Sequence, residues 1–144
     1  MKKTALLLGS TGLIGGHVLQ LLLADDAFDK VITFVRKPLA IKHPKLEQQV
    51  VDFDNPQSYE QLVKGDVIFC CLGTTIKTAG SQSAFKKVDY EYPLNFAIAG
   101  KKNGVSHYLI ISSIGATTNT SNFYLKTKGE IEQELKKLNF DSLS

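Results

Sequence analysis

The chain has 144 residues, of which 43% are hydrophobic and 22% are charged, so it can bury a core of its own and is neither disordered nor fibrous. Its net charge is +3, and its lysines stand in separated pairs without interleaved aromatic residues, which favours solvated helix faces over a nucleic-acid surface. Because no apolar run is long enough to span a bilayer, we predict one cytoplasmic domain over residues 1–144 that binds neither nucleic acid nor membrane.

Apolar, strand-like runs recur along the chain and alternate with segments that have the pattern of helices or loops. The predicted strands are Thr4–Leu8, Val31–Val35, Gln49–Val51, Val67–Cys71 and Tyr108–Ser112. The predicted helices are Leu13–Leu23, a short one within Pro56–Lys64, a long crossover over Ser81–Lys102 and a last one over Asn122–Leu138. This alternation indicates an α/β fold, a Rossmann-type doubly wound parallel sheet with helices on both faces.

The carboxyl-terminal segment, residues 139–144, stands where the alternation calls for a further strand. A doubly wound nucleotide-binding fold usually has six strands, and the sequence supplies five and a stub of the sixth. We therefore expect the chain to be cut short, with carboxyl-terminal strands missing.

A glycine-rich turn follows the first predicted strand, with Gly9, Gly12 and Gly15 at every third position. Glycines there allow a sharp turn, a close approach of backbone N–H groups to phosphate oxygens and tight packing of helix on strand. The helix that follows would direct its positive dipole end at the phosphates. An ordinary tight turn is the alternative. The predicted pyrophosphate-binding residues are Gly9, Ser10, Thr11, Gly12, Leu13, Ile14 and Gly15.

The second predicted strand ends in Arg36 and Lys37, and Arg36 stands 21 residues past Gly15. A carboxylate at this place would bind the adenosine ribose hydroxyls of NAD. A guanidinium instead makes bidentate, charge-assisted bonds to a phosphate, which favours the 2′-phosphate of NADP. The alternative is a solvent-facing arginine in a loop. We predict that Arg36 and Lys37 bind NADP(H).

Two further strand ends point to the same crevice, because ligands of open α/β sheets lie outside the carboxyl ends of the strands. Asp52 and Phe53 are predicted to border the adenine, although ordinary surface turn residues would look much the same. Past the fourth strand, the predicted cofactor contacts are Cys71, Leu72, Gly73 and Thr74. Cys70 and Cys71 are adjacent, and His17, His43 and His107 are scattered, so no metal site is predicted.

Candidate catalytic residues follow the fifth strand. That strand ends in Ser112 and Ser113, and the next helix carries Tyr124 and Lys128, which share one helix face. A nearby ammonium lowers the pKa of a tyrosine hydroxyl, so Tyr124 can exchange a proton with a carbonyl or alcohol oxygen that Ser113 also binds. Lys128 would in addition hold the nicotinamide ribose, and Ser112 is the alternative serine. The competing interpretation has Tyr124 packed in the core and Lys128 in solvent.

Taken in order, these motifs resemble the atypical branch of the short-chain dehydrogenase/reductase superfamily, and most closely its Tat-interactive protein oxidoreductase subfamily. The matching segments are Phe69–Thr75, Val88-Asp89, Ser112-Ser113 and Ser121–Glu130. The resemblance implies an NADPH-binding Rossmann fold with Ser113, Tyr124 and Lys128 as the catalytic serine, tyrosine and lysine. For the family's asparagine in the fourth helix, Asn95 is the candidate by residue type. The family's chain continues into a segment that builds the substrate pocket, and that segment is missing here.

Two functions remain open. The first is an NADP(H)-dependent oxidoreductase that acts on a small carbonyl or alcohol. Whether it forms a homodimer or binds a protein partner is left open. The alternative is a non-catalytic NADP(H)-binding sensor or regulatory module, and a weaker third hypothesis is a fragment that binds nothing.

Overall fold

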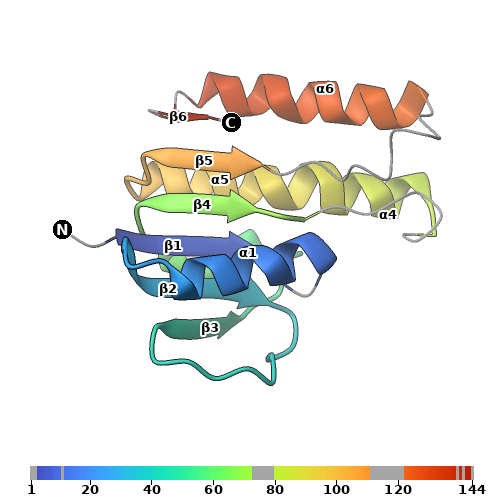
Figure 1. Cartoon of the computed structure of the whole chain (residues 1–144). Coiled ribbons are helices and arrows are strands. Elements are labelled where there is room, and N and C mark those ends of the chain that lie inside the picture. Colours follow the sequence, from blue (N-terminus) through green and yellow to red (C-terminus); the bar gives the residue numbers. More distant parts are fainter. Residues whose placement is uncertain are drawn as a thin grey trace.

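All strands of the sheet run parallel, in the order β3-β2-β1-β4-β5-β6 (Figure 1). The computed structural model describes residues 3–10, 12–72, 80–110, 122–138, 140 and 142–143, and covers only the backbone of residues 13, 82, 122–128 and 142–143. The strands are β1 (Lys3–Leu8), β2 (Phe28–Val35), β3 (Leu46–Val50), β4 (Val67–Cys70), β5 (His107–Ile110) and β6 (Ser142–Leu143). This order confirms the predicted doubly wound sheet, whose direction of winding reverses between β1 and β4.

The predicted strand bounds differ from the observed ones mainly at polar positions. β3 covers Leu46–Val50 rather than Gln49–Val51, because it is an edge strand and carries glutamate and glutamine where the pattern requires apolar residues. β2 begins earlier than predicted, at Phe28, through an exposed aspartate and lysine. β6 is two residues long, as expected for a stub. Of the predicted fifth strand, residues 111 and 112 lie outside the described residues.

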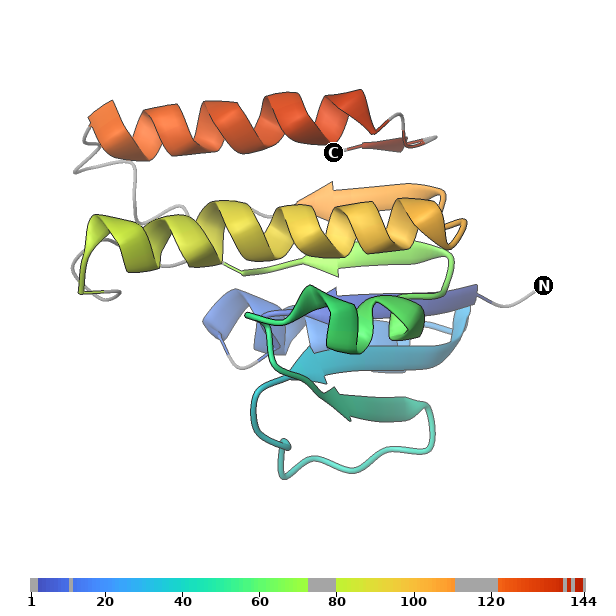
Figure 2. The same cartoon turned by 180° about the vertical axis from the view of Figure 1, so that it is seen from behind.

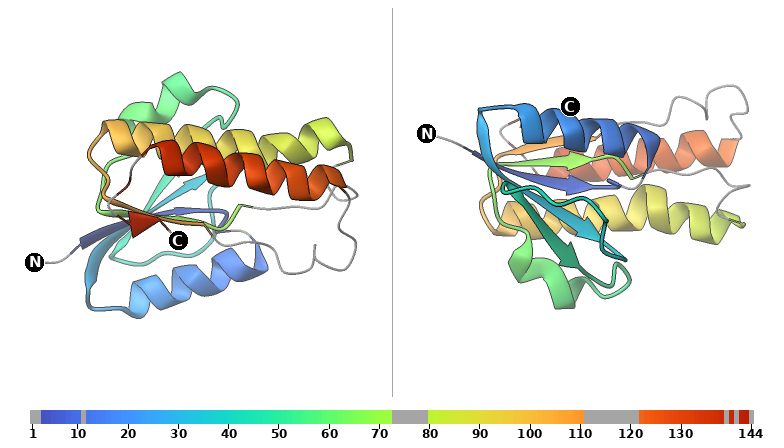
Figure 3. Two further views of the ribbon diagram at one scale, coloured as in Figure 1. Left: turned by 90° about the horizontal axis from the view of Figure 1, so that it is seen from above. Right: turned by 60° about the horizontal axis from the view of Figure 1, so that its bottom comes forward.

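Helices cover both faces of the sheet (Figure 3). Helix α1 (Leu13–Ala24) lies on one face. On the other face lie α2 (Pro56–Tyr59) with the 3-10 turn η1 (Glu60–Leu62), and helices α5 (Tyr92–Lys102) and α6 (Asn122–Lys137), as Figure 2 shows for α2 and α5. None of the described helices is long and apolar enough to cross a membrane.

The predicted long crossover is interrupted by a wider turn. It consists of α4 (Gln82–Lys86), the π-helical turn η2 (Lys87–Glu91) and α5. Ser81 caps its start, where the hydroxyl accepts a hydrogen bond of 3.1 Å from the Ala84 N–H. Pro93 has no N–H to offer the carbonyl four residues earlier, and the π turn accommodates this defect. At the far end Gly104 takes a φ of +89°, and the Val105 N–H bonds the Gly100 carbonyl, so the helix stops where the sequence predicts.

The two faces of β1 bury different side chains, because successive residues of a strand point to opposite faces. Ala5 and Leu7 pack towards α1, in a cluster with Leu19 and Leu22. Leu6 and Leu8 face the other way and join a larger cluster that contains five aromatic residues, namely Phe34, Phe53, Tyr59, Phe96 and Tyr108. Each such buried side chain contributes about 1.5–3 kcal/mol to stability. Phe34, near the end of β2, and Phe53, just after β3, connect this cluster to the site described next.

Candidate nucleotide-binding site

The glycine turn after β1 is fixed by two close backbone approaches. Gly9 has a φ of +81°, and a Cβ on it would lie 2.6 Å from the Cys71 carbonyl carbon at the end of β4. A Cβ on Gly15 would lie 1.8 Å from the Gly9 carbonyl oxygen, so α1 crosses the turn with no room for a side chain. Gly12 is open by comparison, with the Gly9 carbonyl oxygen 3.6 Å away as its nearest neighbour. The structure therefore assigns packing to Gly9 and Gly15, and leaves Gly12 available to a ligand.

Helix α1 begins at a residue that has no side chain to cap its first N–H groups. Its N-cap is Gly12, which makes no side-chain hydrogen bond to the helix, and its first turn carries no acidic residue. Unsatisfied N–H groups and the positive dipole end of a 12-residue helix attract an anion. Together with the open position at Gly12, this arrangement fits a dinucleotide pyrophosphate.

Ser10 is held by a residue that the sequence analysis missed. The Thr33 hydroxyl donates a 2.8 Å hydrogen bond to the Ser10 hydroxyl, and it also lies 3.4 Å from the Leu7 carbonyl. Both side chains are buried. Thr33 thereby ties the glycine turn to the middle of β2. The available signal was a polar residue within the apolar run Val31–Val35.

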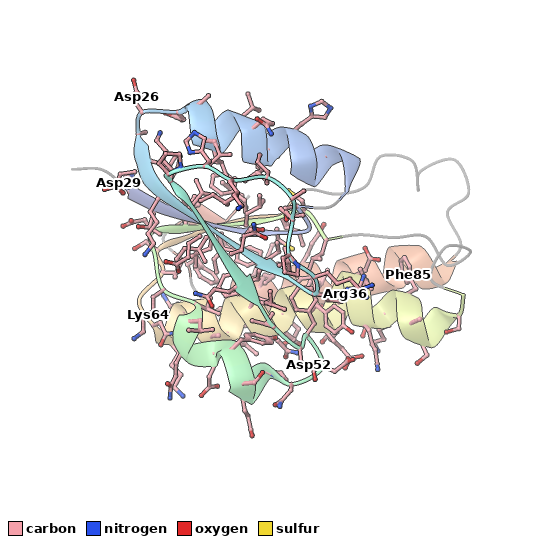
Figure 4. All side chains as sticks on the ribbon, turned by 90° about the horizontal axis from the view of Figure 1, so that it is seen from below. Asp26, Asp29, Arg36, Asp52, Lys64 and Phe85 are labelled. Atoms are coloured by element: carbon pink, nitrogen blue, oxygen red, sulfur yellow. The ribbon has the colours of Figure 1, made fainter. Side chains whose placement is uncertain are left out.

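A cleft of about 460 Å³ opens at the carboxyl ends of β1, β2 and β4. Arg36 lies at this end of the sheet together with Asp52, opposite to Asp29 and Lys64 (Figure 4). The residues that line the cleft are Gly9, Ser10, Phe34, Val35, Arg36, Lys37, Phe53 and Leu72. The structure thus brings together six predicted cofactor residues, namely Gly9, Ser10, Arg36, Lys37, Phe53 and Leu72.

Part of the cleft wall is aromatic, because Phe34 and Phe53 line it. The Phe53 ring packs edge-on against Phe96 at 5.6 Å, and Phe96 contacts Phe34 at 5.1 Å. Asp52, by contrast, is exposed and is not among the lining residues; its carboxylate accepts a 3.0 Å hydrogen bond from the Asp54 N–H. Asp52 therefore shapes the turn that presents Phe53, and its predicted contact with adenine remains a prediction.

The end of β4 closes the cleft beside the glycine turn. The Cys71 N–H donates to the Leu8 carbonyl at 2.9 Å, which pairs the two strand ends. Burial, with a smaller contribution from Cys70, raises the pKa of the Cys71 thiol to about 11, so this thiol is neutral at neutral pH. Of the other predicted residues here, Gly73 and Thr74 lie outside the described residues, as does Thr11, and Leu13 is described by its backbone alone.

The predicted catalytic residues are only partly within the described structure. Ser113 and the alternative Ser112 lie outside it. Tyr124 and Lys128 fall in the first half of α6, whose backbone packs beside η2 and α5, but their side chains are not described. The predicted roles of the three residues therefore remain predictions. Asn95, on α5, lies beside the Tyr59 hydroxyl and is not among the residues lining the cleft.

No cluster of three metal-ligating side chains occurs within the described ranges.

A family model and curated relatives identify the family of this chain. A family model described as NAD(P)H-binding matches residues 9–141. The chain is 38% identical to the protein HTATIP2 of Rattus norvegicus over 99% of its own length, and 37% identical to the mitochondrial protein FMP52 of Candida glabrata over 96%. It spans about 60% of the length of each of these relatives.

Solved structures share the fold at low sequence identity. The Bordetella bronchiseptica enzyme WbmH in complex with NAD+ has a TM-score of 0.79 at 19% identity, and 99% of this chain covers 54% of that one. A short chain dehydrogenase from Leptospira borgpetersenii with bound NAD+ has a TM-score of 0.77 at 16% identity, and 99% of this chain covers 68% of it. From the family model and the curated relatives, the chain belongs to the NAD(P)H-binding atypical short-chain dehydrogenase/reductase family.

Proposed function

We propose that the protein is an NADP(H)-dependent oxidoreductase that acts on a small carbonyl or alcohol. The observation that carries the cofactor part is the pair Arg36 and Lys37, which line the cleft at the end of β2. Two cations there favour a cofactor with an added 2′-phosphate over NAD. The guanidinium offers a planar pair of donors to that phosphate, and the Lys37 ammonium adds a second charge.

The chain's other residues each have a role towards the cofactor. The glycine turn and the start of α1 bind the pyrophosphate through backbone N–H groups. The Phe53 ring and Leu72 form apolar walls for the adenine and its ribose. Ser10, oriented by Thr33, donates its own hydroxyl proton towards the phosphates.

In the proposed reaction, bound NADP(H) supplies or accepts the hydride. Tyr124 donates a proton to the carbonyl oxygen in reduction and removes it in oxidation. The Lys128 ammonium lowers the pKa of the Tyr124 hydroxyl and holds the ribose, and Ser113 donates a hydrogen bond to the same carbonyl oxygen. This assignment rests on the order and spacing of the three residues and on the family to which the chain belongs.

A second candidate function is a non-catalytic NADP(H)-binding sensor. This function needs only the cofactor cleft, which the described residues form. Turnover decides between the two candidates, because both require the cofactor to bind.

The test is a titration of NADPH and NADH into the purified chain, followed by turnover assays with a panel of carbonyl compounds. We expect NADPH to bind more tightly, and Arg36→Gln to lower its affinity by about 10-fold or more while NADH changes little, since hydrogen bonds to charged groups contribute about 1.5–3 kcal/mol. Lys30→Gln is the matched control, because Lys30 pairs with Glu47 outside the cleft. Preference for NADH, or no binding of either, contradicts the proposal.

If turnover is found, Tyr124→Phe should abolish most of it and leave NADPH affinity nearly unchanged. A chain that binds NADPH without turnover of any compound supports the sensor. Equal activity of the Tyr124→Phe variant removes Tyr124 from the reaction.

A further inference from the structure

A small polar cluster joins the loop after β3 to the crossover helices, beside Phe53 of the cleft. The Tyr92 hydroxyl donates a 2.9 Å hydrogen bond to the Asp54 carboxylate, and the Lys87 ammonium lies 3.5 Å from the same oxygen. We call Asp54, Lys87 and Tyr92 the rim clasp. Asp54 directly follows Phe53, whereas Lys87 comes from η2 and Tyr92 begins α5, so the clasp joins segments that are far apart in the sequence.

The clasp sits at the edge of the proposed cofactor cleft. The Tyr92 ring packs edge-on against Phe53 at 5.4 Å, and Phe53 lines the cleft together with Arg36. Charges on both sides of this contact bear on the Tyr92 hydroxyl. Burial and then the bond to Asp54 raise the pKa of Tyr92 to about 12, while the positive charge of Arg36 opposes that shift. Phe53 thus connects the two groups, because its ring packs against Tyr92 of the clasp and it lines the cleft with Arg36.

A carboxylate near a phosphate-binding arginine weakens phosphate binding. If the carboxylate had no other partner, it would either pair with the guanidinium or repel the incoming phosphate. Here Asp54 takes its bonds from Tyr92 and Lys87 instead. Among the described side chains, no carboxylate oxygen forms an ion pair with the Arg36 guanidinium at 4.0 Å or less.

We propose that the rim clasp determines cofactor specificity: Tyr92 and Lys87 hold the Asp54 carboxylate away from Arg36, so that the guanidinium stays available to a 2′-phosphate. The three are positioning residues that act through Arg36. This inference rests on the proposed NADP(H) site. It adds that specificity also depends on side chains that need not touch the cofactor.

The probes are adenosine 2′,5′-bisphosphate and 5′-AMP, which differ by the 2′-phosphate alone and report on this end of the site without any turnover. Their dissociation constants are measured by calorimetry on the full chain. Tyr92→Phe is the decisive variant, because it removes one bond to Asp54 without changing the net charge. We expect it to weaken the bisphosphate about threefold and to leave 5′-AMP unchanged, as suits an exposed interaction.

Repeating the measurement in the Asp54→Asn variant tests whether Tyr92 acts by positioning Asp54 or by direct contact with the phosphate. With Asp54→Asn in place there is no carboxylate to restrain, so Tyr92→Phe should then change neither dissociation constant. Lys87→Gln should act like Tyr92→Phe, and its matched control Lys30→Gln, which breaks a similar exposed ion pair with Glu47, should not.

Three outcomes overturn the proposal. A Tyr92→Phe effect that persists with Asp54→Asn means that Tyr92 contacts the phosphate directly. Equal weakening of both probes means that the clasp only supports the loop around Phe53. An unaltered chain that binds the two probes equally, or binds neither, contradicts the NADP(H) site itself and the clasp with it.

Discussion

The two ends of the cleft are built in opposite ways. At the glycine turn the contacts are between backbone atoms: Gly9 touches the end of β4 and Gly15 touches Gly9, with no space for a Cβ. At the Arg36 end the contacts are between side chains, where the half-buried Tyr92 and the exposed Lys87 bind the exposed Asp54. Backbone packing cannot change without moving the fold, whereas solvated charges can be exchanged cheaply. The first end therefore fixes where a dinucleotide lies, and the second can select which dinucleotide it is.

The strongest test of this contrast is Gly15→Ala. The new methyl group would lie 1.8 Å from the Gly9 carbonyl oxygen and 2.6 Å from its carbon, so α1 must move away from the turn. We expect a loss of about 3 kcal/mol in the free energy of unfolding, at the upper end for overpacking, together with loss of NADPH binding. Urea unfolding followed by circular dichroism measures the first effect.

Gly16→Ala is the matched control, one residue further along the same helix. The nearest atom to its new Cβ is the Ser10 carbonyl oxygen at 3.7 Å, which is an ordinary contact. Alanine is a better helix former than glycine, so this variant should gain about 0.5–1 kcal/mol. Similar losses for both variants would show that the turn is not the rigid element that we describe.

The second test concerns the bond that ties the glycine turn to β2. Thr33→Val keeps the shape of a fully buried side chain but removes the donor to the Ser10 hydroxyl. We expect a loss of about 1–2 kcal/mol in the free energy of unfolding, because a buried hydroxyl is left without its partner. In the Ser10→Ala background the same change should cost less, and additive losses in this double-mutant cycle would contradict the proposed tie.

Much of the fold could be predicted because its signals are local. Each fully covered strand, such as Thr4–Leu8, is an apolar run, and the order of runs and helices specifies a parallel sheet. Prediction was poorest where burial is incomplete, since the edge strand β3 shows its glutamate and glutamine side chains to water in part. The π turn η2 was also missed, because Pro93 signals a defect in the helix but not how the helix absorbs it.

In the site, too, the features with local signals could be predicted and the long-range contacts could not. The glycine spacing and the place of Arg36 follow from counting residues along one βαβ unit, so the sequence was enough to predict them. The bond between Thr33 and Ser10 joins residues 23 apart, and that between Tyr92 and Asp54 joins residues 38 apart. Such pairs depend on the register of β2 and on where α5 crosses the sheet. Neither can be predicted from a local sequence pattern.

A third test uses salt to separate the two ends. Added salt screens exposed charges much more than enclosed ones, with a Debye length of about 10 Å at 0.1 M and about 3 Å at 1 M. The preference for adenosine 2′,5′-bisphosphate over 5′-AMP should therefore fall by about threefold between these concentrations, since it depends on the exposed Arg36. The Arg36→Gln variant should show a smaller preference and almost no dependence on salt. A preference that is insensitive to salt would place the selecting group in an enclosed position.

The smallest effect should come from the thiol beside the glycine turn. Because burial raises the pKa of Cys71 from 9.0 to about 11, the folded protein holds the proton more tightly than the unfolded chain does. The resulting contribution to stability is present below pH 9 and is lost as the pH rises through about 11. Cys71→Ala should accordingly flatten the fall in unfolding free energy over this range, although Tyr92, whose pKa is also raised, keeps part of it. Alkylation of Cys71 by iodoacetamide at pH 8.5 should be slower in the folded chain than in urea. Equal rates would mean that the end of β4, which packs against Gly9, is open to solvent, contrary to the rigid packing described for this end.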